Sequence, residues 1–269
     1  MHRQLASALE APLRVASVVA LLGGLALAGA PAHAQGGDAG RPSVTFALGL
    51  GAGLSPEYPG ASSYRLGPTG SFGVQHLVLP GGLGFGSPGA RPLDPGFGPT
   101  GSFRYLGVRD PADAPELAGT GRIGRTLELG GGLAHVTESS RVFGEVRRGF
   151  GGHRGWVADV GVDAILRPAQ GLVLTAGPRA QWGHRRFVDT YFGVPAGAAL
   201  PAFSASGGLV SVGAELGAFH DFGTGWGVQG TLAWNRLRGD AGRSPITRSG
   251  SRDQYEARLV ITRQFSLRR

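Results

Sequence analysis

The feature that most constrains this chain is a two-residue alternation of apolar with polar or small side chains, which recurs from residue 44 onward. Because successive side chains in a strand point to opposite faces, each such segment is predicted to be a strand with two different faces. In the closing stretch, Tyr255, Leu259 and Ile261 share one face, and Glu256 and Arg258 share the other. One segment alone fits either a soluble sheet or a sheet that faces lipid.

The lengths of the segments and of their connections favour lipid. Each segment runs for about ten residues, which is the length of a tilted membrane-spanning strand. Tight links alternate with long ones, as in outer-membrane barrels that have short turns on one rim and long loops on the other. The tight links are Thr137–Ser140, Arg167–Gly171 and Asp221–Gly225, and the long ones are Val108–Gly124, Gly183–Gly208 and Leu237–Asp253.

We therefore predict an all-β fold, a transmembrane antiparallel up-and-down β-barrel of about 12 strands. The count depends on the stretch Gln75–Gly89. Two short strands around Gly81 and the glycine after it give about 12, and their absence gives about 10. Both totals are even, as in bacterial single-chain barrels.

Composition excludes several other classes of protein. The 50 glycines weaken helix interiors, so helices are not expected to dominate. All 26 basic residues are arginine and the net charge is +8, but these arginines are dispersed rather than clustered, which argues against nucleic-acid binding. With no cysteine in the chain, no disulfide closes the fold.

The first 34 residues are predicted to be a secretory signal peptide. Arg3 and Arg14 form its basic region, Val15–Ala28 is an apolar run, and Ala32-His33-Ala34 is a small-x-small cleavage site. Residues 35–269 then form a single barrel domain. We expect this domain in the outer membrane of a Gram-negative bacterium, in contact with outer-membrane lipid.

Charged side chains on the polar faces of the strands are predicted to point into the barrel lumen, because an arginine that faces lipid costs about 2 to 4 kcal/mol. They carry both signs, so we interpret them as a paired network and keep a selective pore as the alternative. The candidate lumen charges are Glu128, Asp159, Asp163, Arg179, Glu215, Glu256 and Arg258.

Aromatic residues near the strand ends are predicted to lie at the lipid headgroup level. The candidate girdle is Trp156, Trp182, Trp226 and Trp234. Phe265, the aromatic residue of the last strand, is a candidate assembly signal.

The sequence contains only weak matches to nucleotide-binding, metal-binding and catalytic motifs. G-x-G-x-x-G begins at Gly84, Gly96 and Gly225, but no helix pattern follows, so no nucleotide cofactor is expected. The histidines have no metal-binding spacing, and G-x-S-x-G does not occur. His153 in "RRGFGGHRG" is the most suggestive histidine, and we interpret it as a structural polar residue. We expect no cofactor, no metal and no catalytic residue.

Several stretches resemble the MipA/OmpV family, in order along nearly the whole chain after the signal. They are "SPEYPGASSYR", "RRGFGGHRGWVADVGVD", "GPRAQW", "TYFGV" and "GDAGRSPITRSGSRDQY". The resemblance implies an outer-membrane barrel whose best-known members are scaffolds that bring a lytic transglycosylase together with a peptidoglycan synthase. Other members are described as porin-like or as surface antigens. Members commonly end at the last aromatic residue, whereas here Ser266–Arg269 follow Phe265.

Three functions stay open from the sequence. The first is a scaffold or binding protein linked to murein synthesis and turnover enzymes, without chemistry of its own. The second is a small pore for polar solutes. A weaker third is an envelope hydrolase that uses His153. The short turns offer a partner little surface, which counts against the scaffold.

Overall fold

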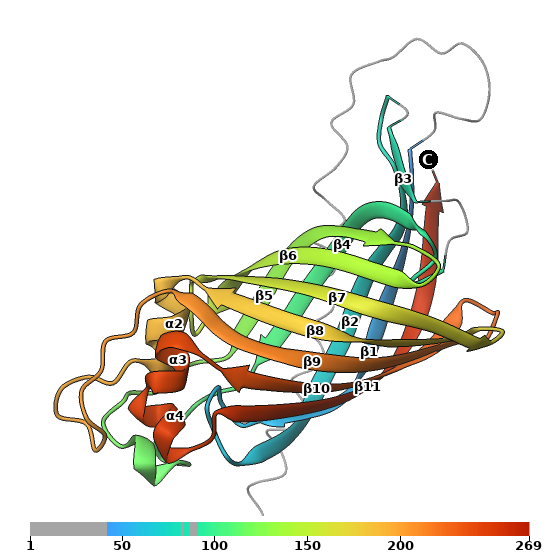
Figure 1. The fold of residues 1–269 in the computed structure, drawn as a ribbon. Coiled ribbons are helices and arrows are strands. Elements are labelled where there is room, and N and C mark those ends of the chain that lie inside the picture. The colour runs from blue at the N-terminus through green and yellow to red at the C-terminus, as the bar shows by residue number, and fades with distance from the viewer. Residues whose placement is uncertain (1–41, 82, 87–90, 269) are drawn as a thin grey trace, which may run out of the picture. The chain divides into compact units, whose positions relative to one another are not determined.

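The computed structural model describes residues 42–81, 83–86 and 91–268, and the predicted signal peptide lies outside these ranges. The described strands form one antiparallel sheet that curls into a barrel (Figure 1). Each described strand pairs with its sequence neighbours, except that no ladder joins β3 to β4, and β1 also pairs with β11. The predicted up-and-down barrel is therefore confirmed. The strands are β1 (Ser43–Pro56), β2 (Tyr64–Val78), β3 (Gly84–Gly86), β4 (Gly96–Leu106), β5 (Thr126–Val136), β6 (Ser140–Gly151), β7 (Trp156–Ala169), β8 (Leu172–Gly183), β9 (Gly208–Asp221), β10 (Trp226–Leu237) and β11 (Asp253–Arg268).

The described strands number 11, close to the prediction of about 12. The difference lies in the stretch 75–89. A hairpin does form there, with Leu77 opposite Phe85, but its first half continues β2 instead of beginning a new strand. The first of the two predicted short strands is therefore the end of β2, and the second is β3.

The two faces of the sheet differ as the alternation predicts. Leu50 is 73% exposed on the outer face, while Ala47 and Thr45 on the opposite face of the same strand are buried. Apolar side chains that are exposed without a protein partner form a belt around the barrel. The belt includes Leu50, Leu66, Leu133, Val162, Leu166, Leu216, Leu232, Leu259 and Ile261.

The two ends of the barrel are built differently. One end, which we call the turn end, carries the start of β1, the end of β11 and the short turns 137–139, 170–171 and 222–225. The other, which we call the loop end, carries the long connections 107–125, 184–207 and 238–252 and the shorter ones 57–63 and 152–155. The alternation of link lengths predicted from the sequence therefore holds.

The loops at the loop end fold into a compact unit, which we call the cap. It contains η2 (Pro115–Leu117), α2 (Arg185–Phe192), α3 (Gly239–Arg243) and α4 (Pro245–Ser249), and Figure 1 shows these elements gathered at one end of the barrel. In the described residues, no helix is long and apolar enough to cross a membrane.

The cap has hydrophobic cores of its own. On α2, Phe187, Val188, Tyr191 and Phe192 are buried, and together they fill one side of the short helix. A second cluster joins loops that are far apart in the sequence, and its members are Tyr58, Ala61, Ala114, Leu117, Val194 and Ile246. Local helix propensity is low in these glycine-rich loops, so this burial is what holds the short helices.

The barrel has one seam, between β2 and β4. In the described part of the chain no backbone ladder joins these two strands, although they lie in contact. A side chain at Gly101 would overlap the ring of Phe72, and a Cβ at Gly70 would lie 3.0 Å from Cζ of Phe103. Two phenylalanine rings, each lying over a glycine of the facing strand, therefore cover the middle of the seam.

Candidate functional site in the barrel lumen

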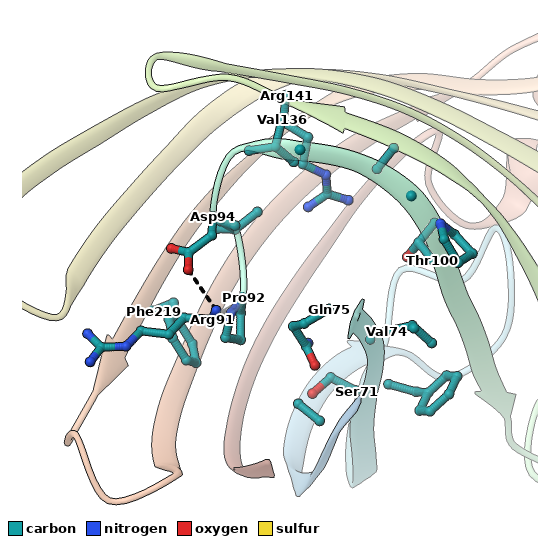
Figure 2. Close-up of a pocket in the computed structure, with 18 of the residues that line it drawn as sticks. Ser71, Val74, Gln75, Arg91, Pro92, Asp94, Thr100, Val136, Arg141 and Phe219 are labelled. Atoms are coloured by element: carbon teal, nitrogen blue, oxygen red, sulfur yellow. Dashed lines mark hydrogen bonds between the residues drawn. The ribbon is translucent and has the colours of Figure 1, made fainter. Parts of the chain in front are cut away.

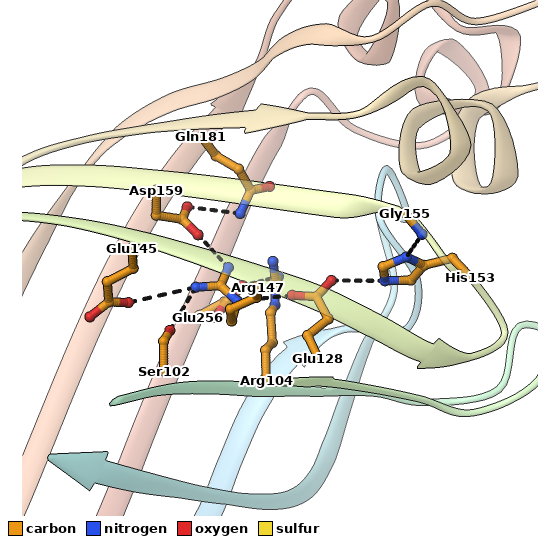
Figure 3. A network of polar contacts seen from close by, with 10 residues as sticks. All are labelled: Ser102, Arg104, Glu128, Glu145, Arg147, His153, Gly155, Asp159, Gln181 and Glu256. Atoms are coloured by element: carbon orange, nitrogen blue, oxygen red, sulfur yellow. Dashed lines mark hydrogen bonds and ion pairs between the residues drawn. The ribbon is translucent and has the colours of Figure 1, made fainter. Parts of the chain in front are cut away.

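A buried arginine, Arg147 on β6, organises the polar side chains in the lumen (Figure 3). Its Nε donates to Oε2 of Glu128 at 3.0 Å and its Nη1 donates to Oγ of Ser102 at 2.9 Å. Its Nη2 pairs with Asp159, whose other oxygen accepts from Nε2 of Gln181 at 3.0 Å. One guanidinium group therefore links strands β4 to β7 from inside.

His153 lies at the loop end of this network and is buried. Its Nε2 lies 2.9 Å from Oε1 of Glu128, and its Nδ1 accepts from the backbone N–H of Gly155 at 3.2 Å. An accepting Nδ1 places the ring proton on Nε2, so the imidazole donates to the carboxylate. Edge-on contacts with Phe187 and Tyr191 enclose the ring. The geometry places the buried His153 ring between the lumen network and the cap.

A second group of charges lies further around the wall. Nη2 of Arg179 lies 2.7 Å from Oδ1 of Asp163 and 3.0 Å from Oε1 of Glu215. Oε2 of Glu215 in turn accepts from Nη2 of Arg258 at 3.1 Å. Arg258 is on β11 and Glu215 on β9, so this contact spans the intervening β10.

One ion pair crosses the lumen. Nη2 of Arg104 on β4 lies 3.1 Å from Oε1 of Glu256 on β11. In the sheet these strands are separated by β1 and β2, so the pair bridges the interior (Figure 3). The paired groups described here are six carboxylates and five guanidinium groups, so the lumen has little net charge.

The cap joins segments that resemble the family motifs. The N–H of Gly60, in "SPEYPGASSYR", donates to Oε1 of Gln254 at 2.9 Å, and Nε2 of Gln254 donates to the carbonyl of Ala61 at 3.1 Å. The hydroxyl of Tyr58 donates to Oε1 of Glu116 at 2.9 Å, and burial, followed by this bond, raises the pKa of Tyr58. The first loop is therefore fixed to the last strand and to η2.

Arg109 is buried inside the cap. Its Nη1 donates to the carbonyl oxygen of Tyr191 at 2.7 Å, and within the described ranges no carboxylate pairs with it. Burial without a counter-charge lowers the pKa of Arg109 to about 10. This arginine holds α2 against the loop that follows β4.

A cavity of about 280 Å³ lies towards the turn end, beside the seam. Phe72 and Phe97 contribute to its lining from β2 and β4, and Thr100, Gln75 and Arg141 contribute polar groups. Figure 2 shows the guanidinium group of Arg141 pointing into the space, with Gln75 on the opposite side. The short segment 91–95 crosses this end, where Nε of Arg91 pairs with Oδ2 of Asp221 at 3.0 Å.

The structure brings all seven predicted lumen charges into contacts with oppositely charged or hydrogen-bonding side chains. It separates them into the group around Arg147, the group around Arg179 and the pair with Arg104. Sequence reasoning missed these partners and Arg141. The alternation of Arg141, Glu145 and Arg147 with outward valines on β6 was the signal that would have identified these three side chains as lumen charges.

The four predicted girdle tryptophans are all exposed on the outside of the barrel. Trp156, Trp182 and Trp234 lie at the loop end, and Trp226 lies at the turn end. The guanidinium of Arg148 lies 5.5 Å from the ring of Trp156, and that of Arg263 lies 5.1 Å from the ring of Trp226. A role at the headgroup level stays a proposal.

Among the described side chains, no three His, Asp or Glu residues lie together as metal ligands would. The chain instead combines an apolar belt, a charged interior and short turns at one end. These features define the class of outer-membrane β-barrels.

The family model described as "MltA-interacting protein MipA" matches residues 48–265. The chain belongs to this family, as the motif resemblance predicted. Among curated proteins, none matches the chain.

Among solved structures, the chain is similar to an outer membrane channel from Pseudomonas putida F1, with 11% identity, coverage of 87% of this chain and 100% of that chain, and a TM-score of 0.42. It is also similar to the toluene transporter TodX of Pseudomonas putida, with 8% identity, coverage of 86% and 90%, and a TM-score of 0.26.

Proposed function

We propose that this protein is a non-catalytic binding platform in the outer membrane, whose turn end faces the periplasm and holds murein enzymes. The partners proposed are a lytic transglycosylase and a peptidoglycan synthase. The description of the family, MltA-interacting protein, supports a protein partner. The orientation follows from the rule that outer-membrane barrels have short periplasmic turns and longer extracellular loops.

The observation that carries the proposal is a sheet that projects at the turn end. β10 begins at Trp226, opposite Arg263, whereas β11 continues to Arg268, which pairs with Ser43 of β1. In the described chain, residues 265–268 therefore have β1 on one side and no strand on the other. Figure 1 shows the end of β11 projecting together with β3 beyond the barrel.

This projecting sheet answers the objection that short turns offer a partner little surface. An open strand edge presents unpaired N–H and C=O groups, which an extended segment of a partner can pair with. Leu267, which is 60% exposed, adds an apolar contact beside that edge. The open edge thus supports a binding surface at the turn end without long turns.

The lumen gives less support to a pore. The cap packs across the loop end, and the Arg104–Glu256 pair bridges the interior. Six carboxylates and five guanidinium groups pair with one another, so their charges largely cancel. The remaining electrostatic potential in the lumen is too small to select ions of one sign.

The experiment is a crosslinked pull-down from native envelopes with the tagged, membrane-inserted protein. The matched variants are Leu267→Lys, which places a charge beside the open edge, and Glu138→Lys, which places the same charge on an exposed turn away from it. We expect wild type and Glu138→Lys to retain a lytic transglycosylase or a peptidoglycan synthase, and Leu267→Lys to lose it.

Recovery of nothing beyond an unrelated barrel of similar size contradicts the platform. Equal recovery by both lysine variants contradicts the edge as its binding surface. Conductance in planar bilayers tests the channel: we expect wild-type protein to give no steps above those of protein-free membranes.

A further inference from the structure

The seam between β2 and β4 is unusual for a barrel wall in lipid. Backbone groups without partners cost several kcal/mol each in a bilayer, so a wall normally closes with a continuous ladder. Here the described residues of β2 before His76 and of β4 face each other without one. Side chains take its place, through Phe72 over Gly101 and Phe103 over Gly70.

Towards the turn end the seam opens into the cavity of about 280 Å³. Its lining includes residues from both faces of the wall. Phe72 and Phe97 come from the outer face, and Phe97 is 51% exposed there, while Ser71 and Thr100 come from the inner face. The lining of the cavity therefore includes residues from both faces of the wall at the seam.

The inner part of the cavity offers groups that suit an anion. Arg141 Nη1 lies 4.0 Å from Oδ2 of Asp163, whereas Arg179 approaches the same carboxylate to 2.7 Å. Of the two guanidinium groups, Arg141 is thus held less closely by this carboxylate, and it also lies 4.1 Å from the ring of Phe143. Gln75 also lines the cavity, and the NH2 group of its amide can donate a hydrogen bond to an anionic ligand.

We propose that this cavity binds a single-chain amphiphile with a carboxylate head group, such as a fatty acid, which enters from the membrane through the β2–β4 seam. The head group lies at Arg141, and the chain passes between Phe72 and Phe97 towards lipid. The volume is near the lower end of ligand pockets, about 300 Å³, so the cavity holds the head group and the first part of the chain while the rest stays in the bilayer. The inference does not depend on the periplasmic partner.

The test uses the full protein in lipid nanodiscs and a dansyl-labelled undecanoic acid as the probe, with its methyl ester as the uncharged control. We expect saturable binding of the acid and about tenfold weaker binding of the ester, because the ester lacks the charge that Arg141 contacts. Arg141→Gln is expected to weaken binding of the acid to the level seen for the ester and to leave binding of the ester unchanged. Arg154→Gln, an exposed arginine at the loop end, is the control.

A second variant tests the entrance. The chain has no cysteine, so Phe72→Cys with Gly101→Cys introduces one possible disulfide across the seam. A Cβ at Gly101 lies 3.1 Å from Cγ of Phe72, which allows the Cβ separation of about 4 Å that a disulfide needs. We expect the oxidised protein to lose binding and to regain it on reduction.

Folding of each variant is checked by heat-dependent migration in gels. If Arg141→Gln does not fold, Gln75→Leu replaces it; because this change removes an amide donor, it is expected to weaken binding of the acid more than binding of the ester. Absence of saturable binding overturns the proposal, as does binding that neither the cavity variants nor the disulfide changes.

Discussion

Arg104 and Glu256 form an ion pair of 3.1 Å between two strands that are not neighbours in the sheet, so this contact braces the barrel from inside. We expect a double-mutant cycle of Arg104→Ala and Glu256→Ala in urea unfolding to give a coupling of about 1 kcal/mol. The control is the Arg236–Asp253 pair, 3.1 Å apart at the more exposed rim, where a smaller coupling is expected. A coupling no larger than that of the control would show that the pair does not brace the barrel.

His153 is predicted to stabilise the protein without taking part in chemistry. His153→Ala removes the donor to Glu128 and the ring between Phe187 and Tyr191, so we expect a loss of about 2 to 4 kcal/mol in the free energy of unfolding. His135→Ala, at an exposed histidine, should change it little. Equal losses in the free energy of unfolding for the two variants would show that His153 does not pack between the lumen and the cap.

Gly60 is expected to be required in the cap. Its φ of +96° is unfavourable for other residues, and a Cβ there would lie 2.9 Å from Oγ1 of Thr247. Gly60→Ala should cost about 1 to 3 kcal/mol and expose the loop end to protease. Gly67→Ala, where a Cβ meets no atom within 4 Å, is the matched control. Unchanged protease resistance in Gly60→Ala would refute this requirement.

The seam is predicted to tolerate no side chain under Phe72. Gly101→Ala should destabilise the barrel by about 1 to 3 kcal/mol, because the added methyl group overlaps the ring. Gly230→Ala, on the outer face of β10 with no atom within 4 Å of the new Cβ, should be neutral. Urea unfolding in detergent measures both, and a neutral Gly101→Ala would mean that Phe72 does not seal the seam.

Phe265 stays a predicted assembly signal, and its packing provides a way to test it. Its ring stacks on Phe46 at 5.5 Å, so Phe46→Ala and Phe265→Ala remove the same contact. We expect Phe265→Ala to lower the yield of folded barrel in envelopes more than Phe46→Ala does. Equal yields would assign Phe265 to packing alone. The strand continues past Phe265, with a bond of 3.1 Å between the hydroxyls of Thr45 and Ser266.

The sequence determined the class of fold because the face of a strand residue depends only on its position along the strand. Alternation therefore predicted the outer belt, the inward direction of residues such as Glu128 and Arg179, and the tight turns. The motifs predicted the family. None of these inferences needed to know which strands meet across the barrel.

The tertiary structure alone decided which distant residues touch. Arg104 and Glu256 are 152 positions apart, and Gly60 and Gln254 are 194 apart, so no local pattern pairs them. The cap escaped prediction because its short helices depend on burial between loops rather than on their own propensity. The seam could not be predicted because β2 and β4 meet only when the sheet curls into a barrel. The cavity beside the seam depends on the same closure.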